Sequence, residues 1–380
     1  MAKGADGTQS SWFQRFLLPG LAFKAVVIGG GYATGRELAE FFLGSGPRGG
    51  LAGMVLAMAV WSLVCAVAFL FARATAAYDY RSFFKALLGR FWLLFEITYL
   101  LFLVLILAVV AAAAGTIGAE VFGLPLIVGT LLLIGAIVGV TSFGNRGAEQ
   151  LFKYASSFIY LTYALFLVLA LTSFGDRIGP AFALYVPADG WALGGVTYAS
   201  YNVVAVVAVL PFVRHLTSRR DAIVAGVLAG PLAMLPALLF FLCMIAFYPA
   251  IGAEALPSDY LLERMSVPSF QYIFQLMIFC ALLETGVGVV NAVNERIAEA
   301  VRDRDSSRFP RIARFAISAS LLVSSAFVAA SVGLIDLIAA GYGAFGYIML
   351  VVFVAPLLLI GTARLRTGAP VRPQENTRAA

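Results

Sequence analysis

Charged residues are scarce in this sequence, and this scarcity decides the class of protein. Only 12% of the 380 residues are Asp, Glu, Lys or Arg, whereas 62% are hydrophobic and the mean hydropathy is +0.94. A soluble domain has about 25% charged residues, and one water-soluble core could not bury so much apolar surface. The apolar residues form long runs rather than the short alternating segments of an outer-membrane barrel. The composition therefore indicates an all-α polytopic membrane protein.

The residues that build metal sites, disulfides and catalytic centres are also few. His215 is the single histidine, and Cys65, Cys243 and Cys280 lie within apolar runs without CxxC spacing, which is typical of small packing residues. No Gly-x-x-x-x-Gly-Lys-Ser/Thr segment is present, so the sequence offers no phosphate-binding loop for ATP-driven pumping. We expect neither an enzyme nor a bound metal or cofactor.

Ten segments are long and apolar enough to cross a bilayer, which takes about 20 residues in a helix. An even number of crossings places both ends of the chain on the same side of the membrane. The ten predicted spans are Leu18–Phe42, Leu51–Ala72, Phe91–Gly115, Leu124–Val140, Leu151–Leu171, Trp191–Phe212, Ala222–Phe247, Phe270–Ala292, Ile312–Ala330 and Gly333–Ile360.

The basic residues of the connections indicate which side this is. Lys and Arg accumulate on the cytoplasmic side of membrane proteins, and here most of them fall in the tails and in alternate connections. Outside the first span, the exceptions are Arg48, Arg177 and Arg264. We therefore expect both termini to be cytoplasmic. The net charge of +6 reflects this topology, so we expect a lipid bilayer around the chain and no nucleic-acid partner.

The spans divide into two halves of five, residues 17–173 and 191–361. An extracellular connection at 174–190 separates them, and cytoplasmic tails at 1–16 and 362–380 flank them. Because each half contains an odd number of spans, the second half must be inverted in the membrane relative to the first. Inverted repeats of this kind occur in many transporters.

A short helix-like stretch follows the second span of each half. Tyr80–Gly89 lies in the inner connection of the first half, and Ser258–Met265 lies in the outer connection of the second half. Equivalent elements on opposite sides of the membrane are what an inverted repeat predicts.

The first span of each half contains residues that disfavour a continuous helix. Span 1 has Gly29, Gly30 and Gly31 in succession, and each costs a helix roughly 1 kcal/mol relative to alanine. Span 6 has a glycine pair followed by Tyr198–Asn202. We predict that both helices are unwound near the midplane, where freed amides attract an anion and freed carbonyls attract a cation. The alternative for the glycines is close helix packing.

Ten spans in a 5+5 inverted repeat, with helices 1 and 6 broken, resemble the LeuT-like fold of the amino acid–polyamine–organocation superfamily. The runs Ile28–Glu37, Tyr198–Asn202 and Glu284–Glu295 are similar to those of YkvI-like bacterial membrane proteins. The resemblance implies a secondary transporter in the bacterial cytoplasmic membrane, with a central site among spans 1, 3, 6, 8 and 10. The Asp-Pro-Gly-Asn segment of metal-transporting relatives is missing, which disfavours manganese or iron as the solute.

Glu284 lies near the middle of span 8, where an ionisable residue is a functional hypothesis by default. Together with Asn291 and Glu295 it lies on one helix face, which forms a polar stripe. Glu284 could exchange a proton in each transport cycle. It could instead bind Na⁺ together with Thr285 and the carbonyls of the span 1 break, or form a salt bridge with Lys24 or Arg36.

Span 1 carries three charges beyond its glycines. Arg36 either binds a solute carboxylate, for which a guanidinium is suited, or pairs with Glu40 one turn away as an extracellular gate. Tyr32 shares a helix face with Arg36, whereas Glu37 points elsewhere and joins Glu284, Thr285 and Asn291 as a candidate for ion or proton coupling.

The aromatic and glycine-rich positions give the remaining candidates. Tyr198 and Tyr201 would form an aromatic wall of the solute site, whereas Trp12, Trp61, Trp92 and Trp191 are typical of interface belts or lipid-facing residues. Gly341–Gly346 in span 10 is either a flexible gate or a packing surface. The full set of predicted solute-binding residues is Gly29, Gly30, Gly31, Tyr32, Arg36, Tyr198, Ser200, Tyr201 and Asn202.

These features together predict a proton- or sodium-coupled secondary transporter that moves a small polar solute by alternating access. An amino acid or a small carboxylate or amine fits the pairing of free amides with acidic and tyrosyl groups. The alternative is a ligand-binding receptor or assembly subunit, since relatives in the superfamily serve in spore-germination receptors. Such a subunit needs partner surfaces, and the short connections offer few. The sequence indicates no particular oligomeric state.

Overall fold

The computed structural model describes residues 10–142, 145–302 and 311–367. Within these ranges every regular element is a helix, and eight helical segments are long and apolar enough to cross a membrane. Two shorter apolar helices, Leu18–Val27 and Leu126–Thr141, accompany them. Predicted spans 2 to 10 each overlap one of these segments, whereas the first is divided between Leu18–Val27 and the start of the segment Arg36–Thr75. Helices are expected here because a chain in lipid must satisfy its backbone polar groups internally. The all-helical class is confirmed, whereas the count of ten crossings stays a prediction.

The helices follow one another along the chain with short connections. The α-helices are α1 (Trp12–Phe16), α2 (Leu18–Val27), α3 (Gly30–Thr34), α4 (Arg36–Phe42), α5 (Gly46–Thr75), α6 (Tyr80–Leu88), α7 (Trp92–Phe122), α8 (Leu126–Ser142), α9 (Asn145–Ala183), α10 (Trp191–Asn202), α11 (Val206–Val209), α12 (Arg219–Ile245), α13 (Pro257–Met265), α14 (Pro268–Arg302), α15 (Arg311–Val332), α16 (Leu334–Asp336), α17 (Gly343–Met349) and α18 (Thr362–Thr367). The 3₁₀ and π segments are η1 (Leu43–Ser45), η2 (Gly89–Phe91), η3 (Val203–Ala205), η4 (Leu210–His215), η5 (Ala250–Ala253), η6 (Leu337–Tyr342), η7 (Leu350–Val354) and η8 (Leu357–Gly361).

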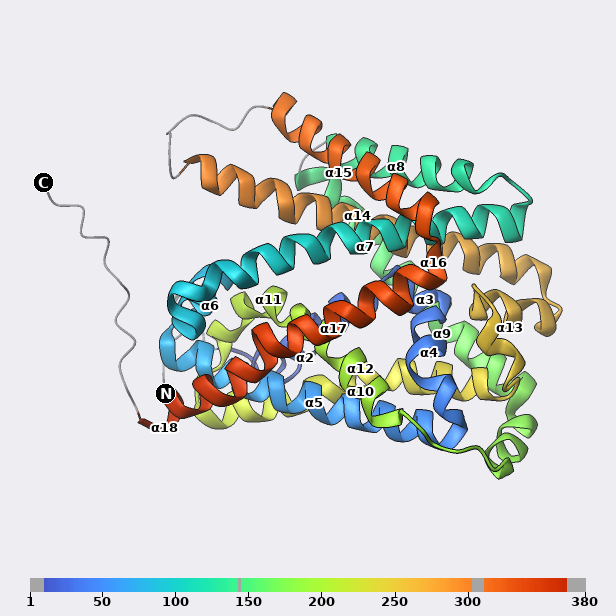
Figure 1. Ribbon diagram of the computed structural model, residues 1–380, viewed down its shortest axis with the longest axis horizontal. Coiled ribbons are helices and arrows are strands. Elements are labelled where there is room, and N and C mark those ends of the chain that lie inside the picture. The colour runs from blue at the N-terminus through green and yellow to red at the C-terminus, as the bar shows by residue number, and fades with distance from the viewer. Residues whose placement is uncertain (1–9, 143–144, 303–310, 368–380) are drawn as a thin grey trace, which may run out of the picture.

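Two groups of long helices make up the bundle. Helices α2, α5, α10 and α12 pack together in one group, and α7, α8, α14 and α15 pack together in the other (Figure 1). The segment that contains α17 packs against both α10 and α7. Each group combines helices from both halves of the chain, as expected if the two halves are interlocked repeats.

The short helices α6 and α13 lie at opposite ends of the bundle (Figure 1). They correspond to the predicted stretches Tyr80–Gly89 and Ser258–Met265, so both predicted helices are confirmed. We call these ends the α6 end, which also holds α1 and α18, and the α13 end. Their placement is the one that an inverted repeat requires.

The predicted connection at 174–190 is wrong in its first part, because α9 continues to Ala183. The extension is stabilised by apolar packing. Phe174 is buried with its ring centroid 4.8 Å from that of Phe247 in an edge-on arrangement, and Ala181 is also buried. The hydropathy window ends at the polar residues Asp176 and Arg177, but a helix does not have to end where its apolar run ends.

Glycines allow α5 and α12 to pack closely side by side. A Cβ atom on Gly226 would lie 2.3 Å from the Cα of Ala66, and one on Gly230 would lie 2.4 Å from the carbonyl oxygen of Met58. Backbone atoms occupy both spaces, so no rotamer change could relieve the overlap. Close approach through small residues is how membrane helices gain packing energy.

We expect Gly226→Ala to lower the stability of the folded protein by about 1–3 kcal/mol, the usual cost of overpacking. Gly135→Ala on α8 is the matched control, because a Cβ there meets no atom within 4 Å and alanine favours the helix. Thermal unfolding of the two purified variants in the same detergent measures the difference. Equal melting temperatures would show that α5 and α12 do not depend on this contact.

Candidate functional site

The first predicted span is interrupted twice. Helix α2 ends at Val27, and the N–H of Gly29 donates to the carbonyl of Val27 at 2.9 Å rather than continuing the α-helical pattern. Gly30 and Gly31 begin the one-turn helix α3, which ends at Gly35 with a φ of +81°. The predicted break in helix 1 is therefore confirmed, and a second one follows it before α4.

Glycine is required at the second interruption and lies closely packed at the first. A Cβ on Gly29 would lie 3.3 Å from Oγ1 of Thr285, and one on Gly35 would lie 2.8 Å from the ring of Phe240. Gly35 also has a left-handed backbone conformation that other residues rarely adopt. Unwinding and close packing, which the sequence left as alternatives, thus occur together.

Span 6 is not broken. Tyr198–Asn202 is α-helical, and Trp191–His215 stays one helical segment through the 3₁₀ turn η3, where the N–H of Val206 donates to the carbonyls of Val203 and Val204. The preceding glycines serve packing, because a Cβ on Gly194 would lie 2.2 Å from the carbonyl oxygen of Phe41. The prediction that Tyr198–Asn202 itself is unwound is wrong, since close packing accounts for the glycine pair.

A buried carboxyl and a tyrosine connect the interrupted first span to α10. Glu37 follows the Gly35 turn at the start of α4 and is only 6% exposed. The hydroxyl of Tyr201 on α10 donates a hydrogen bond of 2.6 Å to Oε2 of Glu37. Within the described part of the chain, no lysine, arginine or histidine forms an ion pair with Glu37. Glu37 is thus a buried acid without a basic partner.

Further tyrosines lie near the Glu37–Tyr201 pair. Tyr32 is on α3 and Tyr342 is on η6, and both of these elements pack against α4, as does α10, which carries Tyr198. The ring centroids of Tyr198 and Tyr342 are 5.6 Å and 4.8 Å from that of Tyr201. All four tyrosines are buried, and the hydroxyl of Tyr198 has no hydrogen-bond partner among the described residues. We call Tyr32, Tyr198, Tyr201 and Tyr342 the tyrosine cage.

Arg36 points away from the cage and binds the outer connection. Its Nη1 donates to the carbonyls of Gly252 and Glu254 at 2.8 and 2.9 Å, and its Nη2 donates to Oε2 of Glu40 at 2.8 Å. Of the two roles left open by the sequence, the ion pair with Glu40 is the one present. Its terminal nitrogens are therefore engaged by protein groups.

A cavity of about 570 Å³ lies between α4, α10 and α17 at the α13 end. Two of its lining residues, Glu40 and Asp189, are acidic, and none is Lys, Arg or His. Phe41 connects the cavity to the site, since it lines the cavity and its ring lies 5.8 Å from Tyr198 and 5.5 Å from Tyr201. The cavity is therefore separated from the cage by an aromatic side chain.

The other residues predicted on span 6 face their own helix. The Ser200 hydroxyl donates to the carbonyl of Val196 at 2.7 Å, and the Asn202 amide donates to that of Tyr198 at 3.0 Å. The structure thus brings Tyr198 and Tyr201 to the site and leaves Ser200 and Asn202 outside the cage.

The predicted coupling residues on α14 lie apart from Glu37. Thr285 faces Gly29 across the span 1 break, and its hydroxyl donates to the carbonyl of Ala281 at 2.9 Å. Glu284 accepts a hydrogen bond of 2.9 Å from Ser156 on α9. Among the described residues Glu284 has no ion pair, so neither Lys24 nor Arg36 neutralises it. Asn291 is half-buried on the same helix, and the side chain of Glu295 lies outside the described residues.

Several site residues were not predicted. Tyr342 belongs to the Gly341–Gly346 cluster, in which Gly346 serves packing, because a Cβ there would lie 2.6 Å from Cγ2 of Thr197, whereas a Cβ on Gly343 would meet no atom within 4 Å. Trp61, predicted to face lipid or an interface, is fully buried and donates to the carbonyl of Ala199 at 3.1 Å. That prediction is wrong because hydropathy does not separate a lipid-facing indole from a buried one. The aromatic residues whose rings lie next to Tyr342 form no recognisable motif in the sequence.

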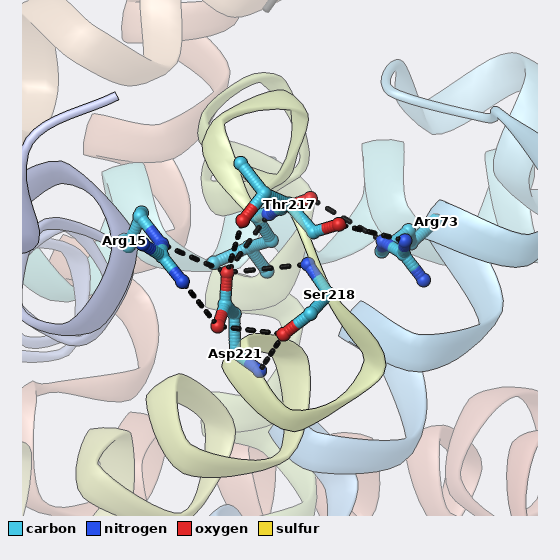
Figure 2. A network of polar contacts seen from close by, with 6 residues as sticks. Arg15, Arg73, Thr217, Ser218 and Asp221 are labelled. Carbon is cyan, nitrogen blue, oxygen red and sulfur yellow. Dashed lines mark hydrogen bonds and ion pairs between the residues drawn. The ribbon is translucent and has the colours of Figure 1, made fainter. Parts of the chain in front are cut away.

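The α6 end is closed by a second polar network, shown in Figure 2. Nε and Nη2 of Arg15 donate to Asp221 at 2.9 and 2.8 Å, and the hydroxyls of Thr217 and Ser218 donate to the same carboxylate. Arg73 donates to the carbonyl of Thr217 at 2.9 Å (Figure 2). This network joins α1, α5 and the start of α12.

The comparisons with known proteins agree with this architecture. No family model matches the chain. It is 25% identical over 356 residues to YkvI, an uncharacterized membrane protein of Bacillus subtilis, and the match covers 91% of this chain and 97% of YkvI. Its structure is similar to that of MhsT in complex with L-phenylalanine, with a TM-score of 0.62, 14% identity and coverage of 94% of this chain and 98% of MhsT. The chain has the LeuT-like fold.

A further solved structure supports the same fold. The manganese transporter of Eremococcus coleocola is 13% identical, has a TM-score of 0.56, and is matched over 95% of this chain and 81% of its own. These structures belong to transporters and not to enzymes. The resemblance to YkvI and to the LeuT-like fold, predicted from the span 1 glycines and the span 6 motif, is confirmed, and the chain is a membrane protein.

Proposed function

We propose that this LeuT-like protein is a secondary active transporter of a small polar solute, an amino acid or a small carboxylate or amine. It moves the solute by alternating access across the bacterial cytoplasmic membrane, with both termini in the cytoplasm and ten crossings. The α6 end is then the inner side and the α13 end the outer side. The process uses no cofactor other than a coupling ion, H⁺ or Na⁺.

One observation carries the proposal, namely the buried Glu37–Tyr201 pair between the interrupted first span and α10. Interrupted helices at the midplane are where LeuT-like transporters bind their solutes. A buried ionisable residue without a structural ion pair is costly, and a functional role accounts for its presence. The adjoining cavity offers a route to the site from the α13 end. A metal solute is disfavoured, since the described residues contain no group of three His, Cys, Asp or Glu side chains that could hold one.

The predicted residues take separate roles in this proposal. Tyr32, Tyr198 and Tyr201 bind the solute, with Tyr342 added from the structure. Gly29, Gly30 and Gly31 supply backbone groups at the break, and Arg36 holds the outer connection. Glu37 carries the coupling proton. Thr285 and the Gly29 backbone are the alternative location for Na⁺, and Glu284 and Asn291 form a second candidate group for coupling.

One experiment distinguishes H⁺ from Na⁺ as the coupling ion. We expect purified protein in proteoliposomes to show solute flux driven by a pH gradient in Na⁺-free buffer, because Glu37 can take up and release a proton. Radiolabelled amino acids, small carboxylates and small amines are supplied in turn, with protein-free liposomes as the control. A strict requirement for Na⁺ would move the coupling to the Gly29–Thr285 contact. No flux of any of these solutes would contradict the transporter proposal.

A further inference from the structure

We infer that the solute is an organic cation, an ammonium or quaternary ammonium compound, which Glu37 and the tyrosine cage bind in place of a proton. This inference rests on the proposed function and narrows its solute class. Solutes that depend on a carboxylate for binding are excluded by it.

The charge balance of the site is the first argument. Glu37 is 6% exposed, and its only hydrogen-bond donor among the described residues is the Tyr201 hydroxyl. An ionised carboxylate buried without a positive partner is strongly disfavoured, so it must take up either a proton or a cation. The nearest basic residue in the sequence, Arg36, is held by Glu40 and by the carbonyls of Gly252 and Glu254. The protein therefore supplies no cation for this position, whereas a solute could.

The aromatic surroundings are the second argument. Tyr32, Tyr198, Tyr201 and Tyr342 come from three segments, α3, α10 and η6, each of which packs against the helix that carries Glu37, and Tyr201 donates a hydrogen bond to its carboxyl. Tyrosine faces attract ammonium groups, and aromatic cages are the usual binding sites for quaternary ammonium ligands. The buried hydroxyl of Tyr198 has no partner in the described structure and is available to a bound solute.

The route to the cage favours the same charge. The cavity at the α13 end is lined by the exposed Asp189 and by Glu40, whose charge is balanced by Arg36, with no basic residue among its lining side chains. A cleft of one charge sign concentrates ligands of the opposite sign. A solute carboxylate would meet Asp189 on entry and, in the cage, Glu37 without a basic partner.

Binding of the solute and of a proton to Glu37 would be mutually exclusive. The groups that face Glu37 are the four cage tyrosines, contributed by α3, α10 and η6, and Arg36 and Glu40 on its own helix are paired with each other. No other titratable group in this set could take over the proton. Exchange of one proton for one cation follows directly, so a vesicle with an acidic lumen would take up the cation.

The test compares four probes that share a benzene ring and differ in charge. They are benzyltrimethylammonium, phenethylamine, phenylalanine and phenylacetate, and their binding to the purified full-length protein is measured by calorimetry at several pH values. We expect the two cations to bind and phenylacetate not to bind. The affinity for benzyltrimethylammonium, whose own charge does not change with pH, should rise about tenfold per pH unit while Glu37 is protonated in the free protein.

Glu37→Gln is expected to lower the affinity for both cations at least about tenfold, the usual effect of losing a charge-assisted contact, and to remove its pH dependence. Glu96→Gln is the matched control, because Glu96 also accepts a hydrogen bond from a tyrosine, Tyr80, but lies outside the cage. Preferential binding of phenylacetate or phenylalanine, or a pH-independent affinity for benzyltrimethylammonium, would overturn the inference. The comparisons among the four probes use the wild-type protein, so they test the inference even if the Glu37→Gln variant does not fold.

Failure of the inference can be told apart from failure of the proposed function. Transport of phenylalanine with no binding of the cations would overturn the inference and leave a transporter in place. Binding of the cations without flux in proteoliposomes would support the inference and contradict the proposed function.

Discussion

Replacing Glu37 by glutamine is expected to abolish solute accumulation driven by a pH gradient. Glutamine has almost the same shape and can still accept the hydrogen bond from Tyr201, so the contact between α4 and α10 is retained. It cannot gain or lose a proton, however, and coupling to the gradient requires that change. The measurement is uptake in proteoliposomes with and without an imposed pH gradient, for wild type and variant at equal protein content.

Glu284→Gln is the comparison variant for this experiment. Glu284 is also in a membrane helix without an ion pair, but it is only half-buried and faces Ser156 on α9. We expect this variant to keep at least half of the gradient-driven uptake. The reverse pattern, with Glu37→Gln active and Glu284→Gln inactive, would assign the coupling proton to α14 and leave Glu37 with a structural role.

Much of the fold could be predicted because lipid restricts the chain to helices. The apolar runs give the helices directly, and the triple glycine predicts the break in span 1 because three adjacent residues each disfavour a helix there, with close packing as the alternative. The helices at Tyr80 and Pro257 could be predicted because each combines polar and apolar residues at helical spacing. The end of α9 was missed, since packing of Phe174 on Phe247 extends the helix beyond its hydropathy maximum.

The site was harder to predict because its contacts join distant parts of the chain. Glu37 and Tyr201 are 164 positions apart, and Tyr342 lies in yet another segment. Tyr32, Tyr198 and Tyr201 could be predicted from their places beside the span 1 glycines and in span 6. Tyr342 and Trp61 could not be told from the belts, because an aromatic residue facing lipid and one facing the core have the same hydropathy. Arg36 could not be assigned either, because its carbonyl partners on Gly252 and Glu254 follow from the path of a connection rather than from a motif.

We expect the second large effect, a loss of stability, from Asp221→Ala, which removes the carboxylate of the polar network at the α6 end. The Asp221 side chain is 2% exposed and accepts hydrogen bonds from Arg15, Thr217 and Ser218 (Figure 2). Removing it leaves these donors unpaired and also removes half of the capping box of α12. Loss of one partner of a buried charge network is strongly destabilising. We expect the melting temperature to fall by roughly 5–10 °C and hydrogen–deuterium exchange in α1 and α2 to accelerate.

Two further variants separate the effect of the Arg15–Asp221 link from the effect of capping α12. Arg15→Ala removes the link to α1 but leaves the cap of α12 intact, so exchange in α1 should accelerate with a smaller change in melting temperature. Asp79→Ala removes an N-cap at the same end, where Asp79 accepts from the N–H of Ser82 at 2.8 Å, and should leave exchange in α1 unchanged. If α1 exchanges at the wild-type rate in Asp221→Ala, the Arg15–Asp221 pair does not hold this end closed. If it exchanges faster, the Arg15–Asp221 pair holds α1 against the start of α12 and so fixes the beginning of the interrupted span that carries Glu37.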